Sequence, residues 1–397
     1  MSETKFSNFT NEDGSTGPDL VGITSFTSPY YFVPPSGTTA QRPSGEGLAP
    51  GMLRFNTDIG RLEVWRADHW GTILGESPNL GISTNPAGTS GGLGTRGVFG
   101  AGFTPTPSNT FLNVIEFVTI STLGNVIDFG DLSVDKGAIS ACSSSTRGVV
   151  AGGYTSNVKL NVIEFITISS TGNSQVFGDL SGVRADISAC SSSTRGVFGG
   201  GYTPTPATTF LNVIEYITIA STGDAKDFGV LSAGKSSLTA CSSSTRGVFG
   251  GGSSPTIVNV IEFITISTLG NAVDFGYLSA GKYSLTACSS STRGVFGGGF
   301  TPTPATTLFN VIEFITISST GNSQDFGDLS VGKSSLTACS SSTRGVFGGG
   351  YTNTPTASRL NVIEYITIAS TGNAVDFGDL TVPKNVLAAC SNGHGGL

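Results

Sequence analysis

The sequence of 397 residues has little charge, little histidine and no long hydrophobic run, and each scarcity excludes a class of protein. Charged residues make up 12%, and 20 Lys and Arg against 27 Asp and Glu leave a net charge of −7. Nucleic-acid binding needs clustered basic residues, so no nucleic-acid partner is expected. Apolar runs such as NVIEFITI are short and contain Glu or Thr, so no membrane insertion is expected. The first residues, MSETKFSNFTNEDG, lack the basic and apolar regions of a secretory signal.

A repeat of about 50 residues organises the chain from about residue 95 onward. The arginines of a recurring phrase TRGV are Arg96, Arg147, Arg195, Arg246, Arg293 and Arg344. The glutamates of a recurring phrase NVIE are Glu116, Glu164, Glu215, Glu262, Glu313 and Glu364. One cysteine follows each NVIE, at Cys142, Cys190, Cys241, Cys288, Cys339 and Cys390. This period is typical of propeller blades and, with abundant glycine and recurring Val, Ile and Phe, predicts an all-β protein.

Each unit is predicted to contain four strands, typified by LTACSSS, RGVFGGG, NVIEFITIS and a shorter DFGDL. NVIEFITI has no clean polar face, which predicts a strand buried on both faces between neighbouring sheets. A Gly-Asn or Gly-Asp pair between the third and fourth strands is predicted to supply the positive φ angles of a tight hairpin. These pairs are Gly124-Asn125, Gly172-Asn173, Gly223-Asp224, Gly270-Asn271, Gly321-Asn322 and Gly372-Asn373.

The spacing of the phrases shows where the unit varies. From the NVIE asparagine to the next cysteine is always 29 residues, and from a cysteine to the next TRGV arginine is always 5. From that arginine to the next NVIE asparagine is 17, 14, 17, 13, 17 and 17 residues, so all length variation lies between the second and third strands. Such loops emerge on one face of a propeller, where rigid scaffolds commonly bind partners. The candidate binding-face residues are Thr104, Pro105, Thr106, Tyr154, Tyr202, Thr203, Pro204, Phe300, Thr301, Pro302, Tyr351 and Thr352.

Aromatic residues at the edges of these loops have two interpretations. They could stack on sugar rings, or they could fill the ends of the blades, which is the favoured interpretation. The residues are Phe103, Tyr154, Tyr202, Phe300 and Tyr351.

The two ends of the repeat region complement each other. The first unit lacks its LTACSSS strand, and the C-terminus supplies an extra copy, VLAACSN, followed by GHGGL. Pairing this last strand into the first blade would remove two open edges. The sequence therefore predicts six blades with a composite first blade.

Each unit resembles a kelch motif. A basic residue opens the innermost strand (Lys136, Arg184, Lys235, Lys282, Lys333 and Lys384), a double glycine ends the second, and a glutamate and an aromatic follow in the third. Phe stands where kelch repeats usually carry Trp, at Phe129, Phe177, Phe228, Phe275, Phe326 and Phe377. The resemblance covers about residues 95–397 and implies a kelch-like β-propeller.

Residues 1–80 differ in composition and are predicted to form an extended docking segment with one β-hairpin. The stretch PPSGTTAQRPSGEGLAPG has too little apolar content for a core. The hairpin is predicted from Met52 to Phe55 and from Leu62 to Trp65, and it is too small to be stable alone. Its candidate docking residues are Met52, Arg54, Phe55, Asn56, Leu62, Glu63, Trp65 and Trp70. This segment is expected to pack on another protein, a second copy of itself or the propeller.

Residues 34–74 resemble a segment of structural proteins of tailed bacteriophages, notably those that infect cyanobacteria. The resemblance lies in PSGTTAQRP, PGMLRFNTD, RLEVW and a following Trp at fixed offsets. Gly/Ser-rich kelch-like repeats behind such a segment are also similar to virion proteins of that group. The resemblance implies a virion component of the tail, neck or head surface, assembled in the host cytoplasm.

The repeated cysteines and carboxylates point away from catalysis. One cysteine per innermost strand forms a ring rather than pairs, so the thiols are predicted to pack as small hydrophobic groups. With only His69 and His394, neither a metal site nor a Ser/His/Asp triad is predicted. DFG, as at Asp128-Phe129-Gly130, and GVFGGG lack the context of kinase or nucleotide-binding motifs. No enzyme activity and no cofactor are expected.

The rings of repeated glutamates and basic residues also have two interpretations. They could pair and so satisfy buried charge, which is favoured, or the basic residues could form an anion-binding collar. A glycosidase would need two carboxylates facing one cleft, whereas symmetry explains the repeated glutamates.

These observations predict a docking segment (1–80), a Gly-rich linker (81–94) and a six-bladed propeller (95–397). The favoured function is attachment of a virion to a host-surface glycan or protein, with other virion proteins or self-association as partners of the N-terminal segment. Two alternatives stay open, namely a purely architectural propeller that clamps or decorates virion proteins, and an intracellular kelch-type adaptor.

Overall fold

The structure is a computed structural model that describes residues 35–44, 47–58, 61–66, 68–72, 95–105, 109–156, 158–204, 208–302 and 306–397. In these ranges every element is a β-strand except the short 3-10 helix η1 (Thr39–Gln41). No helix of this part of the chain is long and apolar enough to cross a membrane. The chain divides into two compact units, Met1–Thr84 and Asn85–Leu397, which we call the N-terminal and C-terminal units. The predicted linker (81–94) lies outside the described residues.

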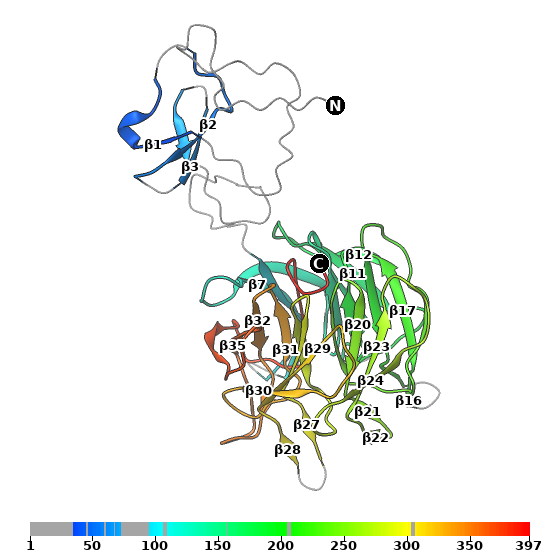
Figure 1. Cartoon of the computed structure of the whole chain (residues 1–397). Helices are drawn as coiled ribbons and strands as arrows, with labels where there is room; N and C mark the ends of the chain where they lie inside the picture. Colours follow the sequence, from blue (N-terminus) through cyan, green and yellow to red (C-terminus); the bar gives the residue numbers. More distant parts are fainter. Residues whose placement is uncertain are drawn as a thin grey trace, which may run out of the picture. The chain divides into compact units, whose positions relative to one another are not determined.

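The described part of the N-terminal unit is a four-stranded sheet (Figure 1). Its strands are β1 (Ser36–Gly37), β2 (Leu53–Asn56), β3 (Arg61–Trp65) and β4 (Trp70–Thr72). The predicted hairpin is confirmed, since β2 and β3 pair in antiparallel register with Arg54 opposite Glu63. In this described part the buried residues are polar, namely Arg54, Asn56 and Glu63, and none is hydrophobic.

The described residues of the C-terminal unit form six large sheets, five of four strands and one of five, and four two-stranded sheets (Figure 1). We number the six large sheets 1 to 6 in the chain order of their second strands. Within each large sheet the strands follow the predicted order from the innermost to the outermost. The innermost strands of sheets 1 to 6 are β37 (Ala388–Ser391), β9 (Ser140–Ser143), β13 (Ser188–Ser191), β19 (Thr239–Ser242), β25 (Thr286–Ser289) and β31 (Thr337–Ser340). The second strands are β5 (Arg96–Gly100), β10 (Arg147–Ala151), β14 (Arg195–Gly199), β20 (Arg246–Gly250), β26 (Arg293–Gly297) and β32 (Arg344–Gly348).

The outer strands complete each sheet. The third strands are β7 (Thr110–Thr119), β11 (Val162–Thr167), β17 (Val213–Thr218), β23 (Val260–Thr265), β29 (Val311–Thr316) and β35 (Val362–Thr367). The fourth strands are β8 (Ile127–Lys136), β12 (Gln175–Asp179), β18 (Lys226–Val230), β24 (Val273–Tyr277), β30 (Gln324–Asp328) and β36 (Val375–Asp379).

Sheet 1 combines the two ends of the repeat region. The C-terminal strand β37 pairs antiparallel with β5, with Cys390 opposite Val98, just as β13 pairs with β14 in sheet 3. The innermost strands lie side by side in the order β9, β13, β19, β25, β31 and β37, and β37 also contacts β9. The architecture is therefore β-propeller-like.

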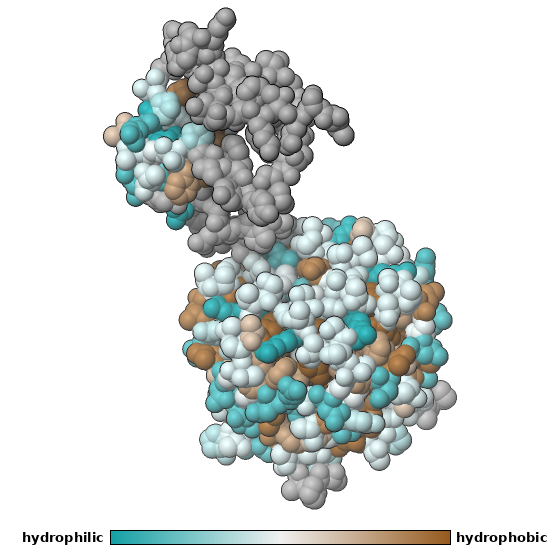
Figure 2. All heavy atoms as spheres, viewed as in Figure 1, coloured by the Kyte–Doolittle hydropathy of each residue, from teal (hydrophilic) through white to brown (hydrophobic). Residues whose placement is uncertain are grey.

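The hydrophobic core lies between the sheets rather than inside any one of them. One cluster joins Cys142, Ile163 and Phe177 of sheet 2 to Phe198 and Ile217 of sheet 3. Equivalent clusters lie between the other neighbouring sheets, including sheets 6 and 1. A third strand with neighbours on both sides therefore needs apolar residues on both faces, as NVIEFITI predicts. On the face seen in Figure 2, hydrophobic residues are scattered among polar ones.

The Gly-Asn and Gly-Asp pairs do not form the predicted tight hairpins. Seven residues separate the third and fourth strands of sheet 2. Gly172 has a φ of 150°, but Asn173 is not in the positive-φ region. The pair reaches the neighbouring sheet instead, where Gly172 N–H donates to the Phe129 carbonyl and Asn173 Oδ1 accepts from Asp131 N–H at 3.0 Å. A side chain close to the hairpin in sequence thus serves the contact between sheets.

Candidate binding face and axial cavity

The loops between the second and third strands gather at one end of the C-terminal unit, which we call the loop end. Short strands form hairpins there, namely β15 (Tyr202–Thr203) with β16 (Thr209–Phe210), β21 (Ser253–Ser254) with β22 (Thr256–Ile257), β27 (Phe300–Thr301) with β28 (Thr307–Leu308), and β33 (Tyr351–Thr352) with β34 (Ser358–Arg359). In sheet 1, β6 (Phe103–Thr104) pairs with the start of β7. In Figure 1 the hairpins lie at the lower end of this unit, and the C-terminus lies at the opposite end, the turn end.

The predicted binding-face residues divide by exposure. The prolines Pro105, Pro204 and Pro302 are exposed, whereas Thr104 and Thr352 are buried. The half-buried residues are Tyr154, Tyr202, Thr203, Phe300, Thr301 and Tyr351. Thr106 lies outside the described residues. The aromatic rings therefore present part of their surface to solvent, and the buried threonines belong to the framework.

Two sets of side chains line the loop end, one of each per sheet. The first set, which we call rim residues, directly follows the glycines after the second strand and comprises Phe103, Tyr154, Tyr202, Ser253, Phe300 and Tyr351. Each rim residue forms a β-bridge with the residue after the repeated basic residue. The second set, which we call spacer residues, lies two positions before the NVIE asparagine and comprises Phe111, Lys159, Phe210, Ile257, Leu308 and Arg359.

Spacer residues can fill the gap between two rim residues. The Phe111 ring lies 5.0 Å from the Phe103 ring and 5.1 Å from the Tyr154 ring, edge to face in both cases. In the next gap, Lys159 Nζ lies 4.0 Å from the Tyr154 ring centre and 4.1 Å from that of Tyr202. Such aromatic and cation–π contacts hold the rim in place.

Lys159 also interacts with polar and charged groups of the loop end. Its ammonium donates a hydrogen bond to the Tyr202 hydroxyl. Burial lowers the pKa of Lys159, and the carboxylate of Asp186 partly opposes that shift. Burial raises the pKa of Asp186, against the opposing effects of Lys159 and a hydrogen bond with Ser237. The two charges therefore partly compensate each other in a poorly solvated place.

The gap between sheets 5 and 6 is open. Its spacer residue is Leu308, and a pocket of about 270 Å³ lies there. The pocket is lined by Tyr283, Ser284, Phe300, Thr306, Leu308, Ser334, Ser335, Tyr351 and Asn353. A branched aliphatic side chain thus leaves space at a position that Phe111 and Lys159 fill elsewhere.

The six repeated basic residues form buried ion pairs with the NVIE glutamates. The pairs are Lys136–Glu164, Arg184–Glu215, Lys235–Glu262, Lys282–Glu313, Lys333–Glu364 and Lys384–Glu116, and no side chain among them is more than 3% exposed. The pairing interpretation is therefore confirmed, and the collar interpretation is wrong because each cation already faces a carboxylate. The basic residue does not open the innermost strand as predicted: Lys235, for example, precedes β19 by four residues.

Each of these glutamates also binds the preceding sheet. The Ser133 N–H in β8 donates to Glu164 in sheet 2 at 2.9 Å, and the Thr381 N–H after β36 donates to Glu116 in sheet 1 at 3.2 Å. Burial raises the pKa of Glu164, but the combined effect of Lys136 and the hydrogen bonds from Ser133 is larger and opposite. The pKa of Glu164 is therefore below its ordinary value. One carboxylate thus neutralises a buried cation and also links two neighbouring sheets by a hydrogen bond.

At the turn end, the TRGV arginines connect neighbouring sheets. Arg195 stacks on Tyr216 of its own sheet, with Cζ 4.7 Å from the ring centre, and its Nη1 donates to the Ile266 carbonyl of the next sheet at 2.9 Å. Arg344 makes the same contacts with Tyr365 and, across sheets 6 and 1, with the Ile120 carbonyl at 2.8 Å. The planar guanidinium stacks on the ring of its own sheet and at the same time donates to the carbonyl of the next sheet.

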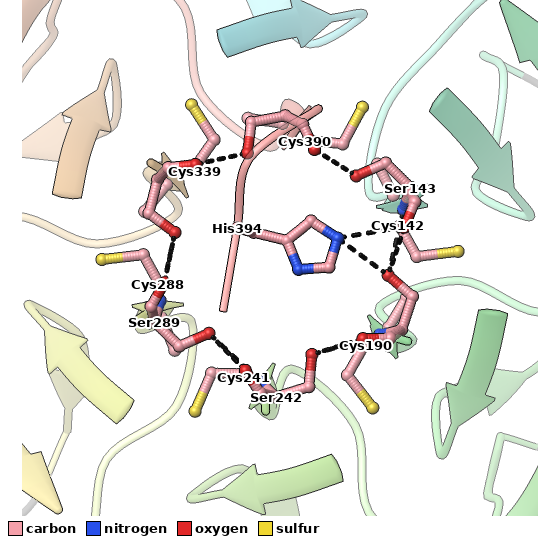
Figure 3. Close-up of a pocket in the computed structure, with 18 of the residues that line it drawn as sticks. Cys142, Ser143, Cys190, Cys241, Ser242, Cys288, Ser289, Cys339, Cys390 and His394 are labelled. Carbon is pink, nitrogen blue, oxygen red and sulfur yellow. Dashed lines mark hydrogen bonds between the residues drawn. The ribbon is translucent and has the colours of Figure 1, made fainter. Parts of the chain in front are cut away.

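The innermost strands surround an axial cavity of about 60 Å³ near the turn end (Figure 3). Each strand ends in a serine whose hydroxyl donates to the carbonyl of the corresponding serine in the preceding sheet. The donor–acceptor pairs are Ser143–Ser391, Ser191–Ser143, Ser242–Ser191, Ser289–Ser242, Ser340–Ser289 and Ser391–Ser340. Figure 3 shows the cysteine sulfurs directed away from the centre of this ring.

His394 occupies the middle of the serine ring (Figure 3). Its Nε2 lies 3.0 Å from the Ser143 carbonyl, and its Nδ1 accepts from Gly396 N–H at 3.0 Å. These partners require a neutral ring protonated on Nε2. Burial lowers the pKa of His394, against a smaller opposing effect of the Ser143 hydrogen bond. The C-terminal GHGGL is therefore an ordered plug.

The six cysteines are buried and free, which confirms their predicted packing role. Each sulfur lies against the glycine of TRGV in the next sheet, and a Cβ added to Gly196 would lie 2.6 Å from Cys142 Sγ. Burial raises the pKa of Cys241 to about 12. Burial also raises the pKa of Cys390 to about 12, although a hydrogen bond with Ser143 opposes this shift. The thiols are therefore protonated and poorly nucleophilic at neutral pH.

The predicted docking residues of the N-terminal unit form a polar interior and an aromatic face. Glu63 accepts hydrogen bonds from Arg54 at 3.2 Å, from Asn56 at 3.0 Å and from Arg42. The hydrogen bond from Arg42 lowers the pKa of Glu63, and burial opposes this shift. Arg54, Asn56 and Glu63 thus lie in the interior of the sheet and stabilise it.

The other docking residues are more accessible. Trp65 and Trp70 lie 5.5 Å apart between ring centres, and Trp70 Nε1 donates to the Pro43 carbonyl at 2.9 Å. Met52 is 41% exposed, and Phe55 and Leu62 are half-buried. These apolar residues are therefore the candidates for contact with another protein.

Sequence reasoning missed two features of the C-terminal unit. The first is His394, which was considered only as a member of catalytic or metal sites, although the GHGGL that contains it directly follows the last innermost strand. The second is the set of spacer residues, since their identity changes from unit to unit. Aligning the units on the NVIE asparagine would have placed them in register.

Comparison with protein families found no family model that matches the chain, and comparison with curated proteins found no match.

Proposed function

We propose that residues 95–397 form a closed six-bladed kelch-like propeller in a non-enzymatic structural protein of a bacteriophage virion. In this proposal the protein is a tail or neck fibre or a surface-decoration component, and its propeller displays the loop end for attachment to the host surface. Closure is supported by the β37–β5 pairing, by the cycle of six serine hydrogen bonds and by the Lys384–Glu116 ion pair.

One observation carries the attachment function: variation in loop length is confined to the loop end of an otherwise repeated framework, where half-buried aromatic residues also differ from unit to unit. The connections between sheets recur from unit to unit, whereas the loops differ. A rigid framework that presents variable loops at one end is suited to recognition. The absence of catalysis is supported by the charges, since the repeated glutamates and basic residues neutralise each other in buried pairs.

The virion assignment rests on the resemblance of residues 34–74 to phage structural proteins. The exposed apolar residues of the N-terminal sheet, Met52 and Leu53, are 41% and 44% exposed and suit docking onto another virion protein or a second copy. A sheet of this size without a described apolar core gains stability when a partner covers it.

The test is adsorption of the purified full chain to a panel of cyanobacterial strains. The matched control replaces the long loops of sheets 1, 3, 5 and 6 with residues 253–258, the loop that natively joins the same strands in sheet 4. Adsorption of the natural chain and its loss in the control would support attachment.

Absence of adsorption by the natural chain, combined with co-purification in particles, would replace attachment by the architectural function. Absence from particles altogether would favour the intracellular adaptor. The second arm is a low-resolution map of the particle, with the chain identified by a tag at its N-terminus.

A further inference from the structure

The pocket between sheets 5 and 6 differs from the equivalent gaps in both its walls and its spacer residue. Tyr283 and Phe300 meet edge to face with ring centres 5.1 Å apart. The residues equivalent to Tyr283 in the other sheets are Asn385, Gly137, Ala185, Ser236 and Ser334, so an aromatic occurs at this position only in sheet 5. The opposite wall carries Tyr351.

The spacer residue leaves the pocket open. Leu308 is the spacer residue of sheet 5. In sheet 1 the equivalent residue, Phe111, bridges two rings. In sheet 6 the equivalent residue, Arg359, lies with its Cζ 4.5 Å from the centre of the Phe103 ring of sheet 1. Leu308 cannot span the same gap, and the pocket of about 270 Å³ is the result. Asn353 and Thr306 are exposed while the rings are half-buried, so the pocket opens to solvent with an aromatic floor.

The chemistry of the lining restricts the ligand. None of the described lining residues is charged, which disfavours an ionic ligand. Three aromatic rings offer flat apolar surface, and the surrounding polar groups are the hydroxyls of Ser284, Thr306 and Ser335 and the amide of Asn353. Burial raises the pKa of Tyr283, so its phenol remains a neutral hydrogen-bond donor at neutral pH. A matching ligand has an apolar face, a rim of hydroxyl groups and no charge.

We infer that this pocket binds a neutral saccharide ring, whose C–H face packs on the tyrosine and phenylalanine rings while its hydroxyls bond to the serine, threonine and asparagine side chains. This inference rests on the proposed attachment function and gives it a ligand class and a place. An aromatic side chain of a protein partner fits the rings but leaves the surrounding hydroxyl groups without matching partners.

The test is saturation-transfer NMR of the full chain with glucose, galactose, mannose and N-acetylglucosamine, followed by titration of the best one. We expect a dissociation constant on the order of 1 mM for a single ring. Two variants keep the framework intact: Tyr283→Ser installs the residue found in sheets 4 and 6, and Leu308→Phe installs the spacer of sheet 1. Each is expected to weaken binding about tenfold or more.

The matched control is Tyr277→Ser, which removes a tyrosine that is 46% exposed on the outer strand β24. Its saccharide affinity should equal that of the natural chain. The inference is overturned if no saccharide of the panel binds, if both variants bind as well as the control, or if N-acetyl-tryptophanamide binds the pocket and the sugars do not.

Parallel adsorption assays separate this inference from the attachment function. If Leu308→Phe abolishes saccharide binding and adsorption together, both are supported. If it abolishes saccharide binding while adsorption persists, attachment stands and the pocket is overturned as its site. If saccharide binds and no strain adsorbs the natural chain, the pocket stands and attachment is overturned.

Discussion

The interfaces between the sheets and the rim of the loop end contrast in what repeats. At the interfaces, the Lys/Arg–Glu pairs, the TRGV arginines and glycines, the cysteines and the serines recur around the six sheets. At the rim, the spacer residue is aromatic in sheets 1 and 3, cationic in sheets 2 and 6 and aliphatic in sheets 4 and 5. Residues that must match two neighbours repeat, and residues that face solvent vary.

This contrast follows from packing. An interface residue fits a neighbour that is itself repeated, so a change on one side leaves a cavity or a clash on the other. A spacer residue is half-buried beside the rim residues, so the cost of changing it is small. Stability should therefore depend on the repeated positions and recognition on the variable ones.

The largest expected effect comes from breaking one repeated ion pair. Lys333→Met leaves Glu364 buried without its cation, and we expect unfolding to become easier by about 3–5 kcal/mol. Chemical denaturation followed by circular dichroism measures the change. The double variant Lys333→Met with Glu364→Met removes both charges and should recover most of the loss. If the single and double variants are equally destabilised, the buried charge is not the cause.

The next effect tests the contact between cysteine and glycine. Gly196→Ala places a Cβ 2.6 Å from Cys142 Sγ, and overpacking should cost about 1–3 kcal/mol. Gly182→Ala is the control, since no atom lies within 4 Å of its added Cβ, and it should be neutral. Adding Cys142→Ala to Gly196→Ala should restore stability, because the sulfur is then absent. A lack of rescue in this double-mutant cycle would show that the clash lies elsewhere.

The contrast also explains how much the sequence could predict. The repeat predicts the strand order, because each phrase has one place in a sheet. Buried cysteines and the ion pairing were predictable too, since a ring of thiols cannot pair and a buried charge needs a partner. The Gly-Asn pairs misled because local turn rules describe a single hairpin, whereas Asn173 serves the neighbouring sheet.

The candidate site was less accessible to sequence reasoning. The variable loops were located by spacing alone, but the pocket depends on Leu308 being too short to bridge Phe300 and Tyr351, which lie in different sheets. Tyr283 was overlooked because it lies outside the variable loops. His394 was overlooked because the partners of its Nε2 are a main-chain carbonyl and a hydroxyl group more than 200 positions away. Packing across sheets, not any local motif, creates these features.

A smaller effect concerns the C-terminal plug, which is unique in the chain yet contacts repeated serines. The pKa of His394 lies below its ordinary value of 6.5, so its neutral form favours the folded state. That contribution is complete above pH 6.5 and is lost as the pH falls through the folded pKa. His394→Gln should cost about 1 kcal/mol at mildly alkaline pH and should lack this loss.

Denaturation midpoints measured across this pH range provide the check. The carboxylates Glu164 and Glu364, whose pKa values are lowered, keep their contribution until the pH falls below their ordinary value of 4.5. The two effects therefore occupy different pH ranges. If the denaturation midpoints of the natural chain and of the His394→Gln variant change with pH in the same way, the assignment of a buried neutral histidine is contradicted.

The smallest effect belongs to the rim and tests the contrast most directly. Lys159→Met removes a cation that lies 4.0 Å from the Tyr154 ring and 4.1 Å from the Tyr202 ring. Because Lys159 is half-buried and a methionine can still pack between the rings, the cost should be about 0.5–1 kcal/mol. Lys333→Met is the same chemical change at a repeated position, and the ratio of the two losses measures how far stability is concentrated at the interfaces. Comparable losses of stability would mean that the rim is part of the framework. The sequences of the variable loops would then be determined by folding and not by ligand binding.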